Sequence, residues 1–283
     1  PPARPPRPPS RVLLCPRWGD FSFPAGERGR GRGRGGGAAG RGAMELLVDM
    51  VSQPSRACVA LCRCAGLPVE VRVVNIAKGG TRAPEFRATN PLGKVPCLVE
   101  RGRPGGAWAL PESCSILRYL CERHGLDAWY PQDLERRARV DSALDWPHST
   151  LRRGCAGLVF GHVIAKRLGA RVPPGSVAAS EAEMVRALGQ LEKYWLGRGE
   201  AFVAGAGPPT IADLILSCEV QQLELLDAPQ DGTDMKGALR PYPRVRQWLA
   251  AVEAALAPHY ADAHAVLRKS AARRRQAAGR GKL

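Results

Sequence analysis

The feature that most constrains how this chain folds is a change of hydrophobic period near residue 131. Between residues 44 and 125, apolar runs of strand length lie on either side of helix-like segments. Beyond residue 131, apolar residues recur only at the spacing that forms one buried stripe of a helix. A strand, a helix and a second strand in succession require a parallel pair with a right-handed crossover. The chain is therefore expected to form a small α/β domain over residues 44–125 and an all-helical domain over residues 132–267.

Within the first domain, the expected order is β-α-β followed by β-β-α. A helix starts at Ser52, with a proline in its first turn, and another starts at Ser113. In the second domain, the segment from Thr210 to Asp213 resembles a capping box. Pro147 falls inside an expected helix, where its missing N–H predicts a kink. Strands are expected at residues 46–51, 69–73, 97–100 and 107–110.

The formal net charge of +16 is confined to the ends of the chain. Residues 1–43 carry nine arginines and two acids, and residues 268–283 carry seven Lys or Arg and no acid, so each end has a net charge of +7. Subtracting both from +16 leaves a net charge of +2 for residues 44–267. Such a balance is that of an ordinary soluble enzyme, and a nucleic-acid partner is not expected for this middle part.

Both ends are expected to lie outside the fold. Residues 1–43 are rich in Pro, then in Arg and Gly, a composition that predicts disorder. The first methionine is Met44, which favours the interpretation that residues 1–43 are untranslated upstream sequence. The alternative is a genuine Arg-Gly arm that binds RNA. Residues 268–283 are expected to form a basic C-terminal tail.

The nine cysteines are an odd number without the spacing of a disulfide scaffold, which favours a reducing compartment and a cytoplasmic location. Cys58, Cys62 and Cys64 lie close together, but they fall on an expected helix without a histidine, so they are interpreted as small buried residues and no metal site is expected. No apolar run reaches the roughly 20 residues that a membrane span needs, so no membrane partner is expected.

Three segments carry candidate chemistry. Ser52 follows the first strand, where its hydroxyl and the free N–H groups of the next helix can face one anion. The alternative is a plain helix cap, which this segment alone favours. Val95 precedes Pro96 at the start of a strand, and the sequence does not give the isomer of that bond. Glu112 and Ser113 begin a helix, where a cap is again the common explanation.

Taken together, these segments resemble the glutathione-site motifs of the theta-class glutathione transferases. The matching stretches are Ser-Gln-Pro-Ser-Arg-Ala at 52–57, Asn-Pro-Leu-Gly-Lys-Val-Pro at 90–96 and Glu-Ser at 112–113. Residues 129–134, 136–141, 148–153 and 210–214 extend the resemblance into the helical part. It implies the cytosolic glutathione transferase fold, in which a thioredoxin-like N-terminal domain is followed by an all-helical C-terminal domain.

The resemblance also implies roles for individual residues. Ser52 would donate a hydrogen bond to the glutathione sulfur. Arg152 would face the electrophile and stabilise its leaving group; the alternative is a solvated helix face beside Arg153. Thr81 stands where many theta enzymes carry a histidine, which predicts weaker glutathione binding. The residues implied to bind glutathione are Gln53, Thr81, Lys94, Val95, Glu112 and Ser113.

By the same resemblance, glutathione is the co-substrate, no metal takes part, and haloalkanes or sulfate esters are the small electrophilic substrates of a homodimer. Residues 270–283 are short and basic, so the C-terminal lid of theta enzymes is expected to be missing. Two alternatives belong to other classes. One is an inactive binding module with the same fold; the other, ranked last, is a nucleic-acid protein acting through its basic ends, whose binding would fall steeply with salt.

Overall fold

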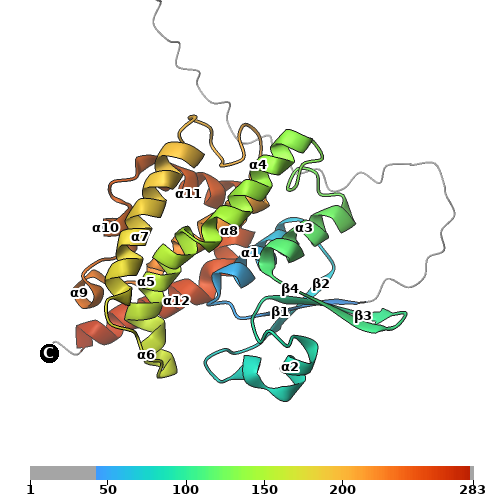
Figure 1. Ribbon diagram of the computed structural model, residues 1–283, viewed down its shortest axis with the longest axis horizontal. Coiled ribbons are helices and arrows are strands. Elements are labelled where there is room, and N and C mark those ends of the chain that lie inside the picture. Colours follow the sequence, from blue (N-terminus) through green and yellow to red (C-terminus); the bar gives the residue numbers. More distant parts are fainter. Residues whose placement is uncertain (1–42, 281–283) are drawn as a thin grey trace, which may run out of the picture. The chain divides into compact units, whose positions relative to one another are not determined.

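A computed structural model of the chain describes residues 43–280, with side chains up to residue 277 (Figure 1). The extension predicted over residues 1–43, with its RNA-binding alternative, thus lies outside the described residues apart from Ala43, as do residues 281–283.

A mixed four-stranded sheet forms the first part of the described chain. Its strands are β1 (Met44–Val48), β2 (Val69–Val73), β3 (Cys97–Arg103) and β4 (Gly106–Pro111), in the order β2-β1-β3-β4. β1 and β2 are parallel, joined by the crossover helix α1 (Gln53–Cys64), and the other two pairs are antiparallel. The order of the sequence segments predicted this small α/β sheet, and the resemblance implied that it is thioredoxin-like.

Both faces of β1 are covered, because successive side chains of a strand point to opposite faces. Leu46 and Val48 belong to the large core that includes α1 and α3 (Ser113–His124). Leu47 packs in a smaller cluster with Phe86 of α2 (Pro84–Thr89). The short helices η2 (Gly80–Arg82) and α2 were not predicted, because six residues or fewer are too short to show a helical period.

The rest of the described chain is helical (Figure 1). α8 lies at its centre, with every residue buried. The predicted capping box is confirmed: the backbone N–H of Thr210 donates to Asp213 Oδ2 at 2.9 Å. The elements are α4 (Leu134–Asp145), η3 (Trp146–His148), η4 (Arg152–Ala156), α5 (Gly157–Val159), η5 (Phe160–Ile164), α6 (Ala165–Leu168), α7 (Ser176–Gln190), η6 (Leu191–Trp195), α8 (Ile211–Gln221), η7 (Gln222–Leu225), α9 (Ala228–Asp231), α10 (Met235–Leu239), α11 (Pro243–Ala255) and α12 (His259–Arg280).

At Pro147, where a kink was predicted, the α-helix is interrupted. α4 ends at Asp145, and the 3₁₀ turn η3 contains the proline. The next segment, η4, has π-helical geometry, which widens the turn that carries Arg152. Single π-turns inside helices are common at functional sites.

Helix α1 belongs to the sheet by sequence but packs against α8 and α12 as well as against α3. Its residues from Gln53 to Cys62 are all buried. The helix on which the candidate site begins is therefore held from both parts of the fold.

The C-terminal segment differs from the prediction. Instead of a tail beginning at residue 268, α12 continues to Arg280. Its basic side chains pair with acids that lie far back in the sequence: Arg268 Nη1 donates to Glu253 Oε1 at 2.9 Å, and Arg274 Nη2 donates to Asp231 Oδ1 at 2.8 Å. The boundary predicted at Leu267 therefore falls in the middle of a helix.

Replacing Arg274 by alanine is expected to loosen the last turns of α12, because the Asp231 side chain is fully buried and loses its arginine partner. A hydrogen bond to a charged group is worth about 2 kcal/mol, so amide exchange there should accelerate roughly thirtyfold. Hydrogen exchange measured along α12 tests this, with the exposed neighbour Arg273→Ala as the matched control. Equal protection in both variants would contradict it.

Candidate functional site

The register of the sheet brings the candidate segments to one edge. Leu47 pairs with Cys97, and Cys97 pairs with Pro111. The end of β1, the start of β3 and the end of β4 therefore meet at the same edge. Ser52 and Glu112 follow two of these strand ends, so the three motifs separated in the sequence are gathered in space.

Ser52 stands at the N-cap position of α1, with extended backbone angles (φ −75°, ψ 120°), yet its side chain makes no capping hydrogen bond. Its backbone N–H donates to Asp49 O at 2.9 Å, and its carbonyl accepts the first helical bond from Arg56 N at 3.1 Å. The plain-cap alternative is therefore not what the structure shows. The hydroxyl stays available beside a helix N-terminus, where an anion is favoured.

The turn that carries Ser52 is fixed by Asp49. One carboxylate oxygen accepts from Val51 N at 2.9 Å, and the other accepts from Ile76 N at 2.9 Å. The same side chain thus closes the turn locally and ties it to the segment after β2. No feature of the sequence singled out Asp49.

Arg56 anchors the same turn to the helical part. Its guanidinium is fully buried and donates to Val51 O at 2.8 Å, to Cys218 O at 3.2 Å and to Gln222 Oε1 at 2.8 Å. Burial lowers the pKa of Arg56. The sequence placed Arg56 within a motif but gave it no role, because two of its partners lie far away in the chain.

Glu112 is the single non-glycine residue with a positive φ in the described part of the chain (φ 68°, ψ 113°). Such a conformation costs free energy and occurs most often at functional sites. Ser113, which follows it, is buried at the start of α3, and its carbonyl accepts a weak bond from Cys58 Sγ at 3.8 Å. The Glu112 side chain itself is exposed.

The loop before β3 places Lys94 and Val95. Asn90 Nδ2 donates to Lys94 O at 2.8 Å, the Val95–Pro96 bond is cis, and the Lys94 side chain is exposed. Thr81 is buried within η2. Within residues 43–280, its hydroxyl makes no hydrogen bond.

Gln53 and Arg152 are brought together by a residue that the sequence did not single out. Gln53 Nε2 donates to Glu219 Oε2 at 3.1 Å, and Arg152 Nη2 donates to Glu219 Oε1 at 2.6 Å. The Glu219 side chain is 1% exposed and that of Arg152 is 37% exposed. Arg152 therefore lies partly exposed but paired with a buried carboxylate, whereas its neighbour Arg153 is exposed.

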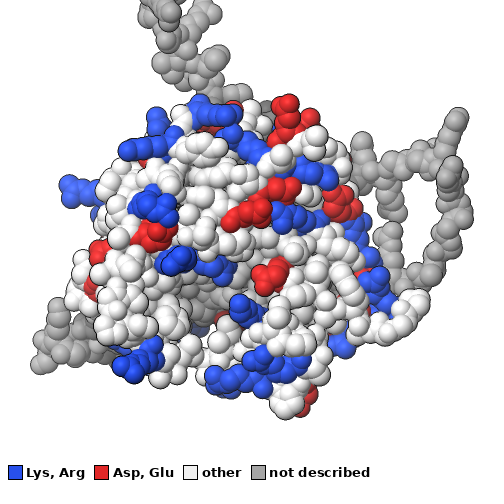
Figure 2. Space-filling view, in the orientation of Figure 1, with Lys and Arg blue, Asp and Glu red and all other residues white. Residues whose placement is uncertain are grey.

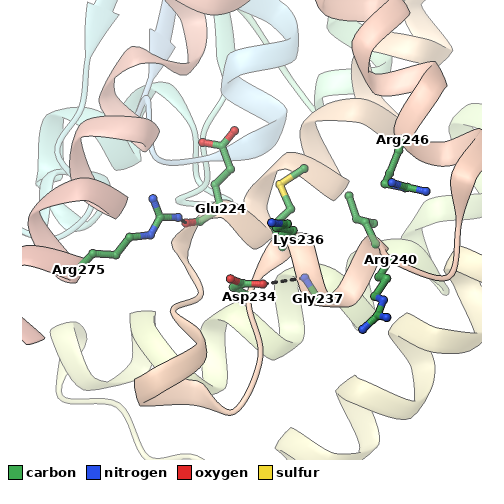
Figure 3. Close-up of a pocket in the computed structure, with 9 residues that line it drawn as sticks. Glu224, Asp234, Lys236, Gly237, Arg240, Arg246 and Arg275 are labelled. Atoms are coloured by element: carbon green, nitrogen blue, oxygen red, sulfur yellow. Dashed lines mark hydrogen bonds between the residues drawn. The ribbon is translucent and has the colours of Figure 1, made fainter.

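A cavity of about 760 Å³ lies elsewhere, between η7, α10, α11 and α12 (Figure 3). Asp234 accepts from Gly237 N at 2.7 Å, and Arg275 Nη2 donates to Glu224 O at 3.0 Å. None of the candidate residues lines this cavity, so it is separate from the site at the sheet edge. Its lining residues are Glu224, Asp234, Met235, Lys236, Gly237, Leu239, Arg240, Arg246 and Arg275.

Surface charge, cysteine burial and possible metal ligands bear on the alternatives to an enzyme site at the sheet edge. On the face shown in Figure 2, Lys and Arg side chains alternate with Asp and Glu rather than forming one basic surface. Cys58 and Cys62 are buried as predicted, whereas Cys64 is only partly buried, and burial raises the pKa of Cys62 to about 12. Within residues 43–280 there is no group of three or more metal-ligating side chains, and none of the helices there has the length and apolarity to cross a membrane.

Comparison with known proteins gives a consistent result. The family model of the glutathione S-transferase N-terminal domain matches residues 46–128, and that of the C-terminal domain matches residues 174–251. Glutathione S-transferase T1 of Arabidopsis thaliana is 38% identical over 228 residues, which cover 80% of this chain and 89% of the relative. Human glutathione S-transferase theta-1 is 36% identical over 230 residues, covering 80% and 90%.

Solved structures agree. A human theta-class glutathione transferase in complex with the glutathione conjugate of 1-menaphthyl sulfate superimposes with a TM-score of 0.71 at 33% identity, covering 82% of this chain and 91% of that one. Human glutathione S-transferase T1-1 in its apo form gives a TM-score of 0.70 at 34% identity, covering 81% and 91%. With both family models matched and these relatives covered nearly end to end, the chain belongs to the glutathione S-transferase family and, within it, to the theta class.

Proposed function

We propose that this chain transfers glutathione to small electrophiles and that Ser52 activates the thiol by donating a hydrogen bond to the sulfur. The observation that carries this role is the Ser52 hydroxyl, which stands at the N-cap of α1 without capping it. A free thiol has a pKa near ~8.5, and lowering this pKa by one unit requires about 1.4 kcal/mol of preference for the thiolate. A charge-assisted hydrogen bond supplies roughly 1.5 to 3 kcal/mol, so the hydroxyl together with the N-terminus of α1 is expected to lower the pKa of the thiol by one to two units.

The rest of glutathione is assigned along the same sheet edge. Lys94 and the Val95 backbone hold the glycine and cysteinyl parts, and Thr81 lies toward the glycine end. Glu112 and Ser113, at the start of α3, bind the ammonium and carboxylate of the γ-glutamyl group.

Gln53 lies next to the sulfur, with its amide nitrogen held by Glu219 at 3.1 Å. The amide group is therefore fixed in orientation, and Gln53 forms part of the lining of the sulfur site.

Arg152 is assigned to the leaving group. The thiolate attacks carbon, a sulfur–carbon bond forms, and the bond to halide or to the sulfate oxygen breaks with its electron pair going to the leaving group. The guanidinium, 37% exposed, is placed to stabilise that charge. The human theta-class structure with the conjugate of 1-menaphthyl sulfate supports sulfate esters as one substrate class.

A homodimer located in the cytoplasm is expected. Measuring the mass of the protein in solution by size-exclusion chromatography tests the dimer.

Ser52→Ala is expected to lower conjugation by at least about tenfold with little loss of stability, because a hydrogen bond made to the thiolate is lost while no capping bond is. Ultraviolet titration of the bound thiolate in the full chain tests this. The parent should ionise the thiol well below ~8.5 and the variant should not. Exposed Ser142→Ala is the control.

Two outcomes would contradict the proposal. A thiolate that forms equally well in Ser52→Ala would remove the assigned role of the hydroxyl. A parent that binds glutathione without ionising it would favour an inactive binding module with the same fold.

A further inference from the structure

The carboxylate of Glu219 is a buried charge at the point where the two parts of the fold meet. It lies on α8, is 1% exposed, and has one donor on each oxygen: Gln53 of α1 and Arg152 of η4. A buried carboxylate is costly unless it is both paired and hydrogen-bonded. Here the pairing comes from Arg152, and Gln53 satisfies the second oxygen.

The other charged and titratable groups around Glu219 do not replace Arg152. Arg56 of α1 is near enough to interact with Glu219 through its charge, but its hydrogen bonds go to carbonyl and amide oxygens. The nearby thiols Cys155 and Cys218 have pKa values raised by burial, and the Glu219 charge adds to this, so both stay neutral. Arg152 is therefore the cation in direct contact with the carboxylate.

Arg152 makes this contact through one nitrogen. Among the hydrogen bonds between described residues, its remaining N–H donors have no acceptor, and its side chain is 37% exposed. The guanidinium is thus held by one nitrogen on the carboxylate that also binds Gln53, and its other N–H donors stay free.

We propose that Glu219 is a positioning residue that orients Arg152 and Gln53 at the sulfur end of the site, and that Arg152 must neutralise its charge before the glutathione thiolate forms. This inference rests on the proposed function. Without Arg152, the unpaired carboxylate beside Gln53 opposes a second anion close by, because buried charges are screened weakly and like charges disfavour ionisation. Arg152 would then act on the nucleophile as well as on the leaving group.

The test is a four-variant cycle in the full chain: parent, Arg152→Ala, Glu219→Gln and the double variant. The readout is the fraction of bound glutathione present as thiolate at neutral pH. Arg152→Ala is expected to lower this fraction about tenfold, and adding Glu219→Gln should raise it again at least about fivefold, since the unpaired charge is gone. Turnover of a haloalkane should follow the thiolate fraction, whereas turnover of a sulfate ester should stay low in both variants that lack Arg152.

Arg152→Lys keeps the positive charge and guards against a variant that fails to fold. It should retain a thiolate fraction at least about fivefold above that of Arg152→Ala, while sulfate-ester turnover falls because an ammonium group cannot make two parallel contacts. A purely structural role for the pair would lower thermal stability without this pattern.

The inference is overturned if Arg152→Ala ionises glutathione as the parent does, or if the double variant is no better than Arg152→Ala. Either result, with a parent that forms the thiolate, leaves the proposed function standing. A parent without a bound thiolate would overturn both.

Discussion

Replacing Arg56 by alanine is expected to lower the free energy of unfolding by about 3 to 5 kcal/mol, because a fully buried guanidinium and its hydrogen bonds to three acceptors are lost. These acceptors are Val51 O, Cys218 O and Gln222 Oε1. Urea denaturation followed by circular dichroism measures the effect. The exposed Arg63 on the same helix supplies the matched control, and Arg63→Ala should change stability by less than about 0.5 kcal/mol.

The same substitution should also reduce thiolate formation in the fraction that stays folded, because the Arg56 guanidinium holds the turn that presents Ser52. A variant as stable as Arg63→Ala would mean that the three acceptors find water, and the anchoring role of Arg56 would be wrong.

Stability is expected to fall as the pH decreases from about 6.5 toward about 3, because His264 is buried in its neutral form. Burial, followed by the nearby charge of Arg56, lowers the pKa of His264 to about 3. Its Nδ1–H donates to Tyr260 O at 2.8 Å, and Nε2 lies 3.7 Å from Cys218 Sγ. Below an unfolded-state pKa of about 6.5, the unfolded chain takes up a proton that the folded chain refuses.

Between these two values the unfolded state binds more protons, so each pH unit removed costs about 1.4 kcal/mol, or about 2 kcal/mol by pH 5. Above about 6.5 both states are neutral and this contribution to the pH dependence vanishes. Urea denaturation at a series of pH values measures the slope. His264→Gln should flatten it, whereas His148→Gln, at an exposed histidine, should not. A parent with no slope between pH 6.5 and 5 would contradict the neutral buried histidine.

The parts of the fold that local patterns control were predictable from the sequence. The alternation in β2, the proline in the first turn of α1, the capping box at Thr210 and the break at Pro147 each act within a few residues, and all are present. α2 was missed because six residues show no period. The continuation of α12 was missed because its arginines are matched by Asp231 and Glu253, which no local signal connects to them.

The candidate site divides in the same way. The positions of Ser52 and Glu112 follow from strand ends, which the sequence shows, and their roles remain predictions. The Gln53–Glu219 contact spans 166 residues and the Arg152–Glu219 contact spans 67. Such pairs depend on how α1, η4 and α8 pack together, and one buried glutamate in an apolar helix gives no sign of its partners.

The packing of α1 between α3, α8 and α12 has a consequence for how such a chain can change over generations. Gln53 and Arg56 are matched to Glu219 and Gln222 on the other part of the fold. Exchanging the sheet-bearing half for that of a distant relative would separate residues that are hydrogen-bonded to each other. The two halves are therefore expected to be inherited together. Substitutions on α1 are expected to be accompanied by compensating substitutions on α8.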